Sequence, residues 1–178
     1  MPEERFEIPY DRYLNLTLQR LLDPGLLLVA RGGDGKRPNA MTIGWASFGV
    51  IWGLPVCVVL VRPSRYTYGL IEACGDFTVN VLPADLASAV SICGTLSGRD
   101  HDKLAMAGLH PVEAQAVSSP ILAEALIAYE CKVVHKNDVL PDQLAAEVQR
   151  SCYPKGDYHR LYFGQILRAS ARPSPELA

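Results

Sequence analysis

The feature that most limits how this chain can fold is a run of 24 residues without a charged side chain, from Pro38 to Val61. A run of that length could cross a bilayer as a helix. Glycines, polar residues and a proline interrupt it, however, and the stretch from Gly53 to Pro55 divides it in two. These residues are typical of turns and unfavourable inside a helix. We therefore expect two buried strands joined by a turn, and no membrane span.

Strand and turn patterns alternate along most of the chain. The 14 glycines and 13 prolines favour many turns, and the glycine-rich stretch 32–36 predicts a hairpin turn. Apolar runs predict strands at 26–31, 39–48, 56–61, 76–82, 125–136 and 161–169. The stretch 62–75 fits a junction from a strand to a short helix that stops at Gly75. Further short helices are expected at 84–93 and from Ser97 to Gly108, while 14–22 fits a helix or a strand. The pattern predicts one mainly β domain over 1–178, folded as a closed or partly closed antiparallel barrel.

Charge and cysteine content narrow the class of protein. With 17 Lys and Arg against 19 Asp and Glu, the net charge is −2 and no stretch is strongly basic, which argues against nucleic-acid binding. The five cysteines are scattered and form no CxxC or Cys/His cluster, so we expect no metal site. Their odd number suggests a reducing, cytoplasmic compartment. The first ten residues are acidic and mixed, unlike a signal peptide.

The densest polar cluster comes directly before a helical pattern and comprises Arg62, Ser64, Arg65 and Thr67. Guanidinium groups bind phosphate with charge-assisted hydrogen bonds, and a helix start adds free N–H groups. The cluster therefore predicts a phosphate site, with Ser64 and Thr67 as candidate caps and Gly75 as the residue after the helix. The alternative is a capped helix with two solvated arginines. A second helix start predicts a phosphate site for the same reason; its residues are Ser97, Gly98, Arg99 and Lys103. The alternative is again a capped helix with surface charges.

Two further features are weaker when they are taken alone. In the segment from Asn39 to Ser47, small and polar residues alternate with large apolar ones, so a flat heterocycle could lie against the backbone. An ordinary core strand explains that segment better without other information. His159 precedes the last expected strand, where a lone histidine is usually structural. The sequence contains no GxSxG, GxxxxGK[ST], HExxH or GxGxxG motif.

Six segments, taken in order, resemble the flavin reductase-like, FMN-binding split-barrel family, and its flavoredoxin-type members in particular. They are PNAMTIGW at 38–45, RPSRYTY at 62–68, GDFTVN at 75–80, SGRDHDK at 97–103, ECK at 130–132 and HRLYFGQI at 159–166. The resemblance covers roughly residues 20–170. Two departures stand out: Gln165 occupies a position where the family usually has Glu, and residues 137–156 match no pattern that we can assign.

The resemblance implies a six-stranded antiparallel split barrel of Greek-key type that forms a homodimer with one FMN per subunit. Residues expected along the flavin ring are Met41, Thr42, Trp45, Ala46 and Ser47, and Asn39 is also expected to bind the cofactor. Residues expected to hold the phosphate and ribityl chain are Arg62, Ser64, Arg65, Tyr66 and Thr67, completed by Ser97, Gly98, Arg99 and Lys103. His159 matches a histidine near the flavin or nicotinamide face and is the one candidate catalytic residue. If it acts there, an imidazole that gains charge near pH 6.5 would give the rate a pH dependence.

The implied activity is that of an NAD(P)H-dependent flavin reductase, in which hydride passes from the nicotinamide to the flavin. The expected electron acceptor is free flavin or an acceptor protein. One alternative is an electron-carrier flavoprotein that a protein partner reduces. A second alternative is a binding module whose flavin site has decayed, although Arg62 and Arg65 argue against it. The sequence does not separate NADH from NADPH as the donor.

Overall fold

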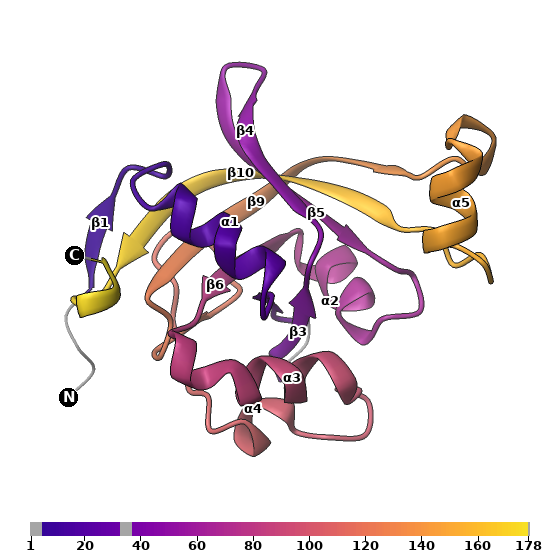
Figure 1. Cartoon of the computed structure of the whole chain (residues 1–178). Coiled ribbons are helices and arrows are strands. Elements are labelled where there is room, and N and C mark those ends of the chain that lie inside the picture. The colour runs from indigo at the N-terminus through magenta and orange to yellow at the C-terminus, as the bar shows by residue number, and fades with distance from the viewer. Residues whose placement is uncertain (1–4, 33–36, 178) are drawn as a thin grey trace.

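The architecture is a strongly bent antiparallel sheet with short helices around it (Figure 1), seen in a computed structural model that describes residues 5–32 and 37–177. The strands are β1 (Phe6–Ile8), β2 (Leu26–Ala30), β3 (Asn39–Ile43), β4 (Ala46–Ile51), β5 (Leu54–Val61), β6 (Asp76–Val81), β7 (Pro111–Val112), β8 (Ile121–Leu122), β9 (Ile127–Asp138) and β10 (Arg160–Ala171). The helices are α1 (Leu14–Leu22), α2 (Tyr66–Cys74), α3 (Ala87–Thr95), α4 (Lys103–Met106) and α5 (Ala146–Cys152). Single 3₁₀ turns lie at Ala84–Leu86, Pro141–Gln143 and Pro175–Leu177.

The main sheet is open between two strands that are neighbours in sequence. Its order is β3-β2-β6-β9-β10-β5-β4, with β1 paired to β10, and the pairings are antiparallel. In the part of the chain that the structure describes, no ladder joins β3 to β4, so the barrel is split there. The predicted mainly β fold with a few short helices is confirmed. The sheet has eight strands where six were expected, because the short β1 is added and one predicted strand is divided.

The divided strand lies in the uncharged run. The prediction of one strand over 39–48 is wrong, because the chain leaves the sheet at Gly44 and Trp45 and re-enters it at the opposite edge as β4. A single glycine inside an apolar pattern is compatible with a continuous strand, so the break was not visible in the sequence. The turn predicted around Gly53 is confirmed: Trp52 and Gly53 have φ values of 56° and 72° and join β4 to β5.

The core consists of two clusters of buried apolar side chains. Leu26, Leu28, Val59, Phe77 and Tyr129 are fully buried in the larger cluster of apolar side chains. Residues 14–22 form the helix α1, which packs near β2. A smaller cluster joins the far face of β2 to α3 and α4, on the lower side of the molecule in Figure 1. The helices α2 and α3 therefore flank the strands β2 and β3 next to the opening of the barrel.

Two helix starts differ from the sequence-based expectation. The helix expected from Ser97 begins six residues later, because Asp102 accepts from the backbone N–H of Ala105 at 3.2 Å and caps α4. The Ser97 hydroxyl accepts instead from the N–H of Arg99 at 3.2 Å, a local turn that competes with helix. No side chain caps α2, whose N-cap residue is Arg65, so the expected caps at 64 and 67 are not formed. Gly75 ends α2 with a φ of 74°, as predicted.

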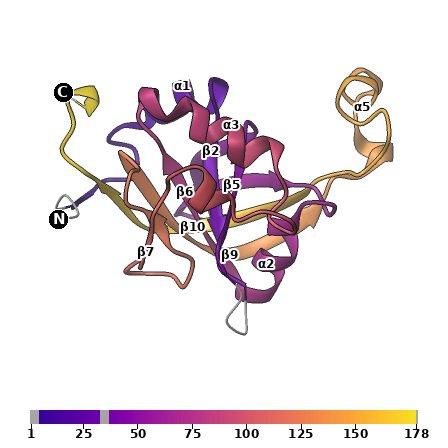
Figure 2. The same ribbon diagram turned by 90° about the horizontal axis from the view of Figure 1, so that it is seen from below.

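The segment that matched no sequence pattern forms a projecting arm. Residues 139–158, between β9 and β10, make up this arm; it carries α5 and lies far from β1 in both views (Figures 1 and 2). The last residues of β9 remain paired with the first residues of β10, which also pairs with β5. The hairpin turn predicted for 32–36 lies almost wholly outside the described residues, although the strands on either side of it, β2 and β3, are paired. In the described ranges, no helix has the length and apolar character needed to cross a membrane.

Candidate functional site

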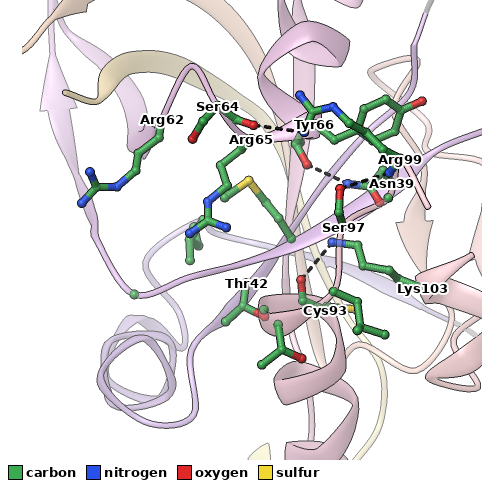
Figure 3. Close-up of a pocket in the computed structure, with 18 of the residues that line it drawn as sticks. Asn39, Thr42, Arg62, Ser64, Arg65, Tyr66, Cys93, Ser97, Arg99 and Lys103 are labelled. Carbon is green, nitrogen blue, oxygen red and sulfur yellow. Dashed lines mark hydrogen bonds between the residues drawn. The ribbon is translucent and has the colours of Figure 1, made fainter. Parts of the chain in front are cut away.

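A pocket of about 350 Å³ lies where the barrel is split. Its walls come from β3, the link between β3 and β4, the start of α2, the end of α3 and the loop before α4 (Figure 3). The predicted site residues in its lining are Asn39, Met41, Thr42, Trp45, Arg62, Ser64, Arg65, Tyr66, Thr67, Ser97, Gly98, Arg99, Lys103 and His159. Ala46 and Ser47 lie on β4 outside this lining. The structure therefore brings all but two of the predicted residues to one cavity.

Close packing between three segments sets the shape of the pocket. The side-chain amide of Asn39 on β3 donates to the hydroxyl of Thr67 on α2 at 2.8 Å, and both residues are buried. Gly98 lies directly against this pair: a Cβ there would overlap the Asn39 side-chain oxygen and approach the Tyr66 ring at 2.8 Å. A residue larger than glycine would therefore push the 96–99 loop away from β3 and α2.

The pocket lining is strongly cationic. Among the described residues that line it are Arg62, Arg65, Arg99 and Lys103, but no Asp or Glu. Lys103 is only 4% exposed, and its ammonium donates to the carbonyl of Cys93 at 2.9 Å. Burial, together with the charge of Arg65, lowers the pKa of Lys103. Such a cluster of like charges suits an anion that accepts several hydrogen bonds at once.

Arg99 and Arg65 differ in how they are held. The Arg99 guanidinium donates to the carbonyl of Ser64 at 3.1 Å and lies over the Tyr66 ring at 5.6 Å. These contacts fix Arg99 beside the start of α2. Arg65 precedes the first residue of that helix, whose backbone N–H groups have no side-chain cap. In Figure 3, Arg65 extends toward Thr42, into the region between β3 and α2.

Arg62 and Ser64, predicted as phosphate ligands, make their contacts with the arm. The guanidinium of Arg62 donates to the carbonyls of Cys152 and Asp157, each at 2.9 Å. The Ser64 hydroxyl donates to the carboxylate of Asp157 at 2.5 Å. Figure 3 shows Arg62 pointing away from Arg99 and Lys103. Nothing in the sequence indicated this role, because the arm matched no known pattern.

One wall of the pocket is aromatic. The His159 ring lies 4.9 Å from the Trp45 ring, centroid to centroid, and its Nδ1 is 2.8 Å from the hydroxyl oxygen of Tyr153 on the arm. His159 is 8% exposed, and burial, with the charge of Arg62 next in importance, lowers the pKa of its imidazole to about 4. The ring is therefore neutral at physiological pH. The pH dependence near 6.5 expected of this histidine does not follow from the structure.

The end of α3 contributes lining residues that the sequence did not suggest. Cys93, Gly94 and Thr95 line the pocket, and a Cβ at Gly94 would lie 3.2 Å from the Thr42 side chain on β3. Burial raises the pKa of the Cys93 thiol, so this cysteine is not an activated nucleophile. No group of three or more His, Cys, Asp and Glu side chains that could bind a metal occurs in the described part of the chain.

Comparison with known proteins gives one family and one fold. Residues 20–177 match the family model described as the flavin reductase like domain. An uncharacterized protein of Archaeoglobus fulgidus is 31% identical over 135 residues, which are 76% of this chain and 66% of that protein. The chain therefore spans only about two thirds of that relative.

Several solved structures share the fold. The flavoredoxin of Desulfovibrio vulgaris (Miyazaki F) is 26% identical with a TM-score of 0.66, covering 83% of this chain and 69% of its own. An FMN-binding domain of a flavin reductases-like enzyme from Shewanella baltica is 18% identical with a TM-score of 0.67, over 96% and 78% of the two chains. An NADH:FAD oxidoreductase of Streptomyces globisporus is 19% identical with a TM-score of 0.63, covering 95% of this chain and 89% of its own.

Proposed function

This chain belongs to the flavin reductase-like domain family, and on that premise we propose that it binds FMN in the pocket at the split of the barrel and reduces it with NADH or NADPH. The observation that carries the proposal is the set of basic groups in the pocket lining, which contains no carboxylate among the described residues. A flavin that ends in a phosphate dianion matches this charge, whereas a neutral ligand leaves the cations unpaired.

The phosphate end would be bound by Arg65, Arg99 and Lys103 together with the uncapped start of α2. Arg65 is the N-cap residue of that helix, Arg99 is fixed over Tyr66, and the buried Lys103 donates to the Cys93 carbonyl. Free N–H groups at a helix start and guanidinium groups are both good phosphate donors. Ser97 and Gly98 complete this end of the pocket.

The flat part of the ligand would lie along β3 and the link that follows it. Asn39, Met41, Thr42 and Trp45 line this side, and Gly98 lets the opposite loop approach closely. Trp45 is 42% exposed, so it borders the open face of the pocket. Pockets of this kind combine apolar contact area with a few directed polar groups.

Bound FMN would supply the hydride-accepting ring, so the protein needs no nucleophile of its own. The chain's residues would bind and orient the two nucleotides and exclude water. Because His159 is neutral and buried beside Trp45, it offers a flat, uncharged surface on the open side of the pocket. We assign it the role of seating the nicotinamide, not that of an acid with a pKa near neutrality.

Two assays test the proposal. Fluorescence titration of the purified protein with FMN should give saturable binding that is tighter than binding of riboflavin, which lacks the phosphate. Steady-state oxidation of NADH and NADPH in the presence of FMN should exceed the rate of the flavin alone. Failure to bind FMN would refute the cofactor assignment, whereas binding without nicotinamide oxidation would refute only the reductase activity.

The second candidate function is an electron-carrier flavoprotein. The similarity to a flavoredoxin at 26% identity favours it, and it needs the same FMN site without a nicotinamide site. Nicotinamide oxidation again discriminates the two functions. A carrier binds FMN but does not oxidise NADH or NADPH, because a partner protein reduces its flavin. The electron acceptor would be free flavin or a protein in either case.

The assembly proposed for the chain is a homodimer in a reducing compartment such as the cytoplasm. Val50 and Trp52, at the tip of the β4–β5 hairpin that rises from the body in Figure 1, are 64% and 61% exposed. Exposed apolar residues on a projecting hairpin support association with a second surface. The five cysteines are all unpaired, in keeping with a reducing environment.

A further inference from the structure

The arm that carries α5 is fastened to the body at the edge of the pocket. Arg62, at the end of β5, donates to the carbonyls of Cys152, Gly156 and Asp157. Its guanidinium also lies 5.1 Å from the centre of the Tyr153 ring. These contacts hold both ends of the turn 152–157 on the same side chain. The turn is therefore part of the pocket's support, although most of the arm is exposed.

Tyr153 is the residue through which this turn reaches the pocket. It is 5% exposed, and its ring stacks on Tyr158 with centroids 4.7 Å apart. Its hydroxyl lies 2.8 Å from Nδ1 of His159, and its ring meets Trp45 edge-on at 6.3 Å. Tyr153 thus touches both aromatic residues of the pocket wall without lining the pocket itself.

A hydrogen bond at Nδ1 restricts the imidazole in two ways. It limits rotation of the ring, and it couples the position of the imidazole proton to the orientation of the Tyr153 hydroxyl, which can donate or accept. Because the low pKa of His159 keeps the ring neutral, one ring nitrogen carries a proton and the other does not. Whether Nε2 donates or accepts a hydrogen bond is therefore coupled to the hydrogen bond that Nδ1 makes. In the described residues, the Tyr153 hydroxyl is that partner.

We propose that Tyr153 is a positioning residue, which seats His159 against Trp45 and so sets the affinity of the pocket for the nicotinamide donor. This inference rests on the proposed function for the identity of the donor. It assigns a role to the arm, the part of the chain that departs from the family pattern: through Tyr153 the arm determines how well a second planar ligand fits on the open side of the pocket.

The variant Tyr153→Phe removes only the hydroxyl and keeps the ring that packs on Arg62 and Tyr158. Loss of one hydrogen bond should raise KM for NAD(P)H about threefold to tenfold. The FMN dissociation constant should stay within about twofold, since Tyr153 does not line the pocket. The matched control is Tyr158→Phe: that hydroxyl accepts from Nε2 of Gln149 at 3.0 Å, and no recorded hydrogen bond joins it to His159 in the described residues. Its KM should equal that of the wild type.

A double variant shows whether Tyr153 acts through His159. If it does, Tyr153→Phe combined with His159→Ala should give the KM of His159→Ala alone, within about twofold. Independent, multiplying effects of the two substitutions would overturn the positioning role. Equal KM values for Tyr153→Phe and Tyr158→Phe would overturn it as well.

A spectroscopic readout on the flavin-free protein separates this inference from the proposed function. The imidazole nitrogen resonances of His159, identified by their loss in His159→Ala, should shift in Tyr153→Phe and remain in place in Tyr158→Phe. Unchanged resonances in Tyr153→Phe would refute the contact. A wild type that binds FMN but oxidises neither nicotinamide would refute the reductase proposal and the donor role together, while the resonances still decide whether Tyr153 positions the ring.

Discussion

Nη2 of Arg62 donates to the backbone carbonyl of Cys152 at 2.9 Å, across 90 positions of the chain. This contact indicates that Arg62 and Arg65, which the sequence predicted as phosphate ligands, have different roles. Arg62 supports the arm, while Arg65 stands at the uncapped start of α2 and faces the pocket. The two side chains should therefore respond differently to the same substitution.

Arg65→Ala should weaken FMN binding by about tenfold to a hundredfold, the range expected for a lost charge-assisted hydrogen bond. Riboflavin binding should change by less than about threefold, because riboflavin has no phosphate for Arg65 to contact. Arg62→Ala should keep the preference for FMN over riboflavin and should instead raise KM for the nicotinamide, since the arm loses its attachment. Fluorescence titrations with both flavins measure the ratio directly.

The charge control for this pair is Arg31→Ala. Arg31 pairs with Glu113 at 2.6 Å and lies outside the pocket lining, so its loss changes the net charge equally without touching the site. Its FMN affinity should match that of the wild type. If Arg62→Ala abolishes the preference for FMN as fully as Arg65→Ala, then Arg62 binds the phosphate and the division of roles is wrong.

Gly98→Ala should damage the pocket through shape alone. The added methyl overlaps the Asn39 side chain and presses on the Tyr66 ring, and overpacking of this kind costs about 1–3 kcal/mol. FMN affinity should fall, because the loop must move away from α2. Gly69→Ala is the control: in the exposed face of α2 its methyl meets no atom within 4 Å, so stability should be unchanged or about 0.5–1 kcal/mol higher. Urea midpoints and FMN titrations compare the two, and equal behaviour would contradict the packing argument.

The free energy of unfolding should fall below about pH 6.5 because of His159. Its pKa is about 4 in the folded protein, where burial and the nearby Arg62 and Arg65 outweigh the opposite influence of Asp157, against 6.5 as the ordinary value. Between these values the unfolded chain binds one more proton at this site than the folded chain, so stability declines as the pH falls through the window.

Urea unfolding at about pH 7.5 and about pH 5 checks this. His159→Gln, which keeps a polar side chain but does not titrate, should lose less stability between the two conditions than the wild type. The same loss in both proteins would assign the pH effect to other groups. Within about pH 5.5–8, kcat should show no inflection from His159, in contrast to the expectation from an unperturbed imidazole.

Sedimentation of the FMN-loaded protein at micromolar concentration should give twice the mass of the chain. The hydrophobic content of 49% and the exposed Val50 and Trp52 on the β4–β5 hairpin are the observations behind this expectation. A monomer that still retains FMN would contradict the proposed homodimer and would show that one subunit suffices to form the flavin site.

Local patterns predicted most of the elements that form the body. Gly75 marked the end of α2, Gly53 marked the β4–β5 turn, and the apolar runs marked β2, β5, β6, β9 and β10. Two predictions failed because the arrangement in space decides the structure. β3 and β4, on either side of Gly44, each pair with the neighbouring strand in sequence and lie at opposite edges of the sheet, which the apolar pattern does not reveal. Ser64 bonds to Asp157, 93 positions away, instead of capping α2.

The same distinction separates the predicted part of the site from the missed part. Asn39, Arg65, Gly98 and their neighbours belong to short motifs: the basic residues at two helix starts suggested a phosphate, and the resemblance to a known family added the planar ligand. Tyr153 lies on a segment without recognisable pattern, and only folding brings it within 2.8 Å of His159. Tyr153 follows the exposed helix α5, and nothing in the local sequence indicates that its side chain will be buried against a pocket wall.

The most direct test of the account is anaerobic addition of NADH and of NADPH to the FMN-loaded protein, followed through the visible absorption band of the oxidised flavin. The account predicts that the purified protein retains FMN in stoichiometric amount and that at least one of the two donors bleaches the band completely. A protein that retains no flavin, or whose flavin band persists with both donors, would contradict it.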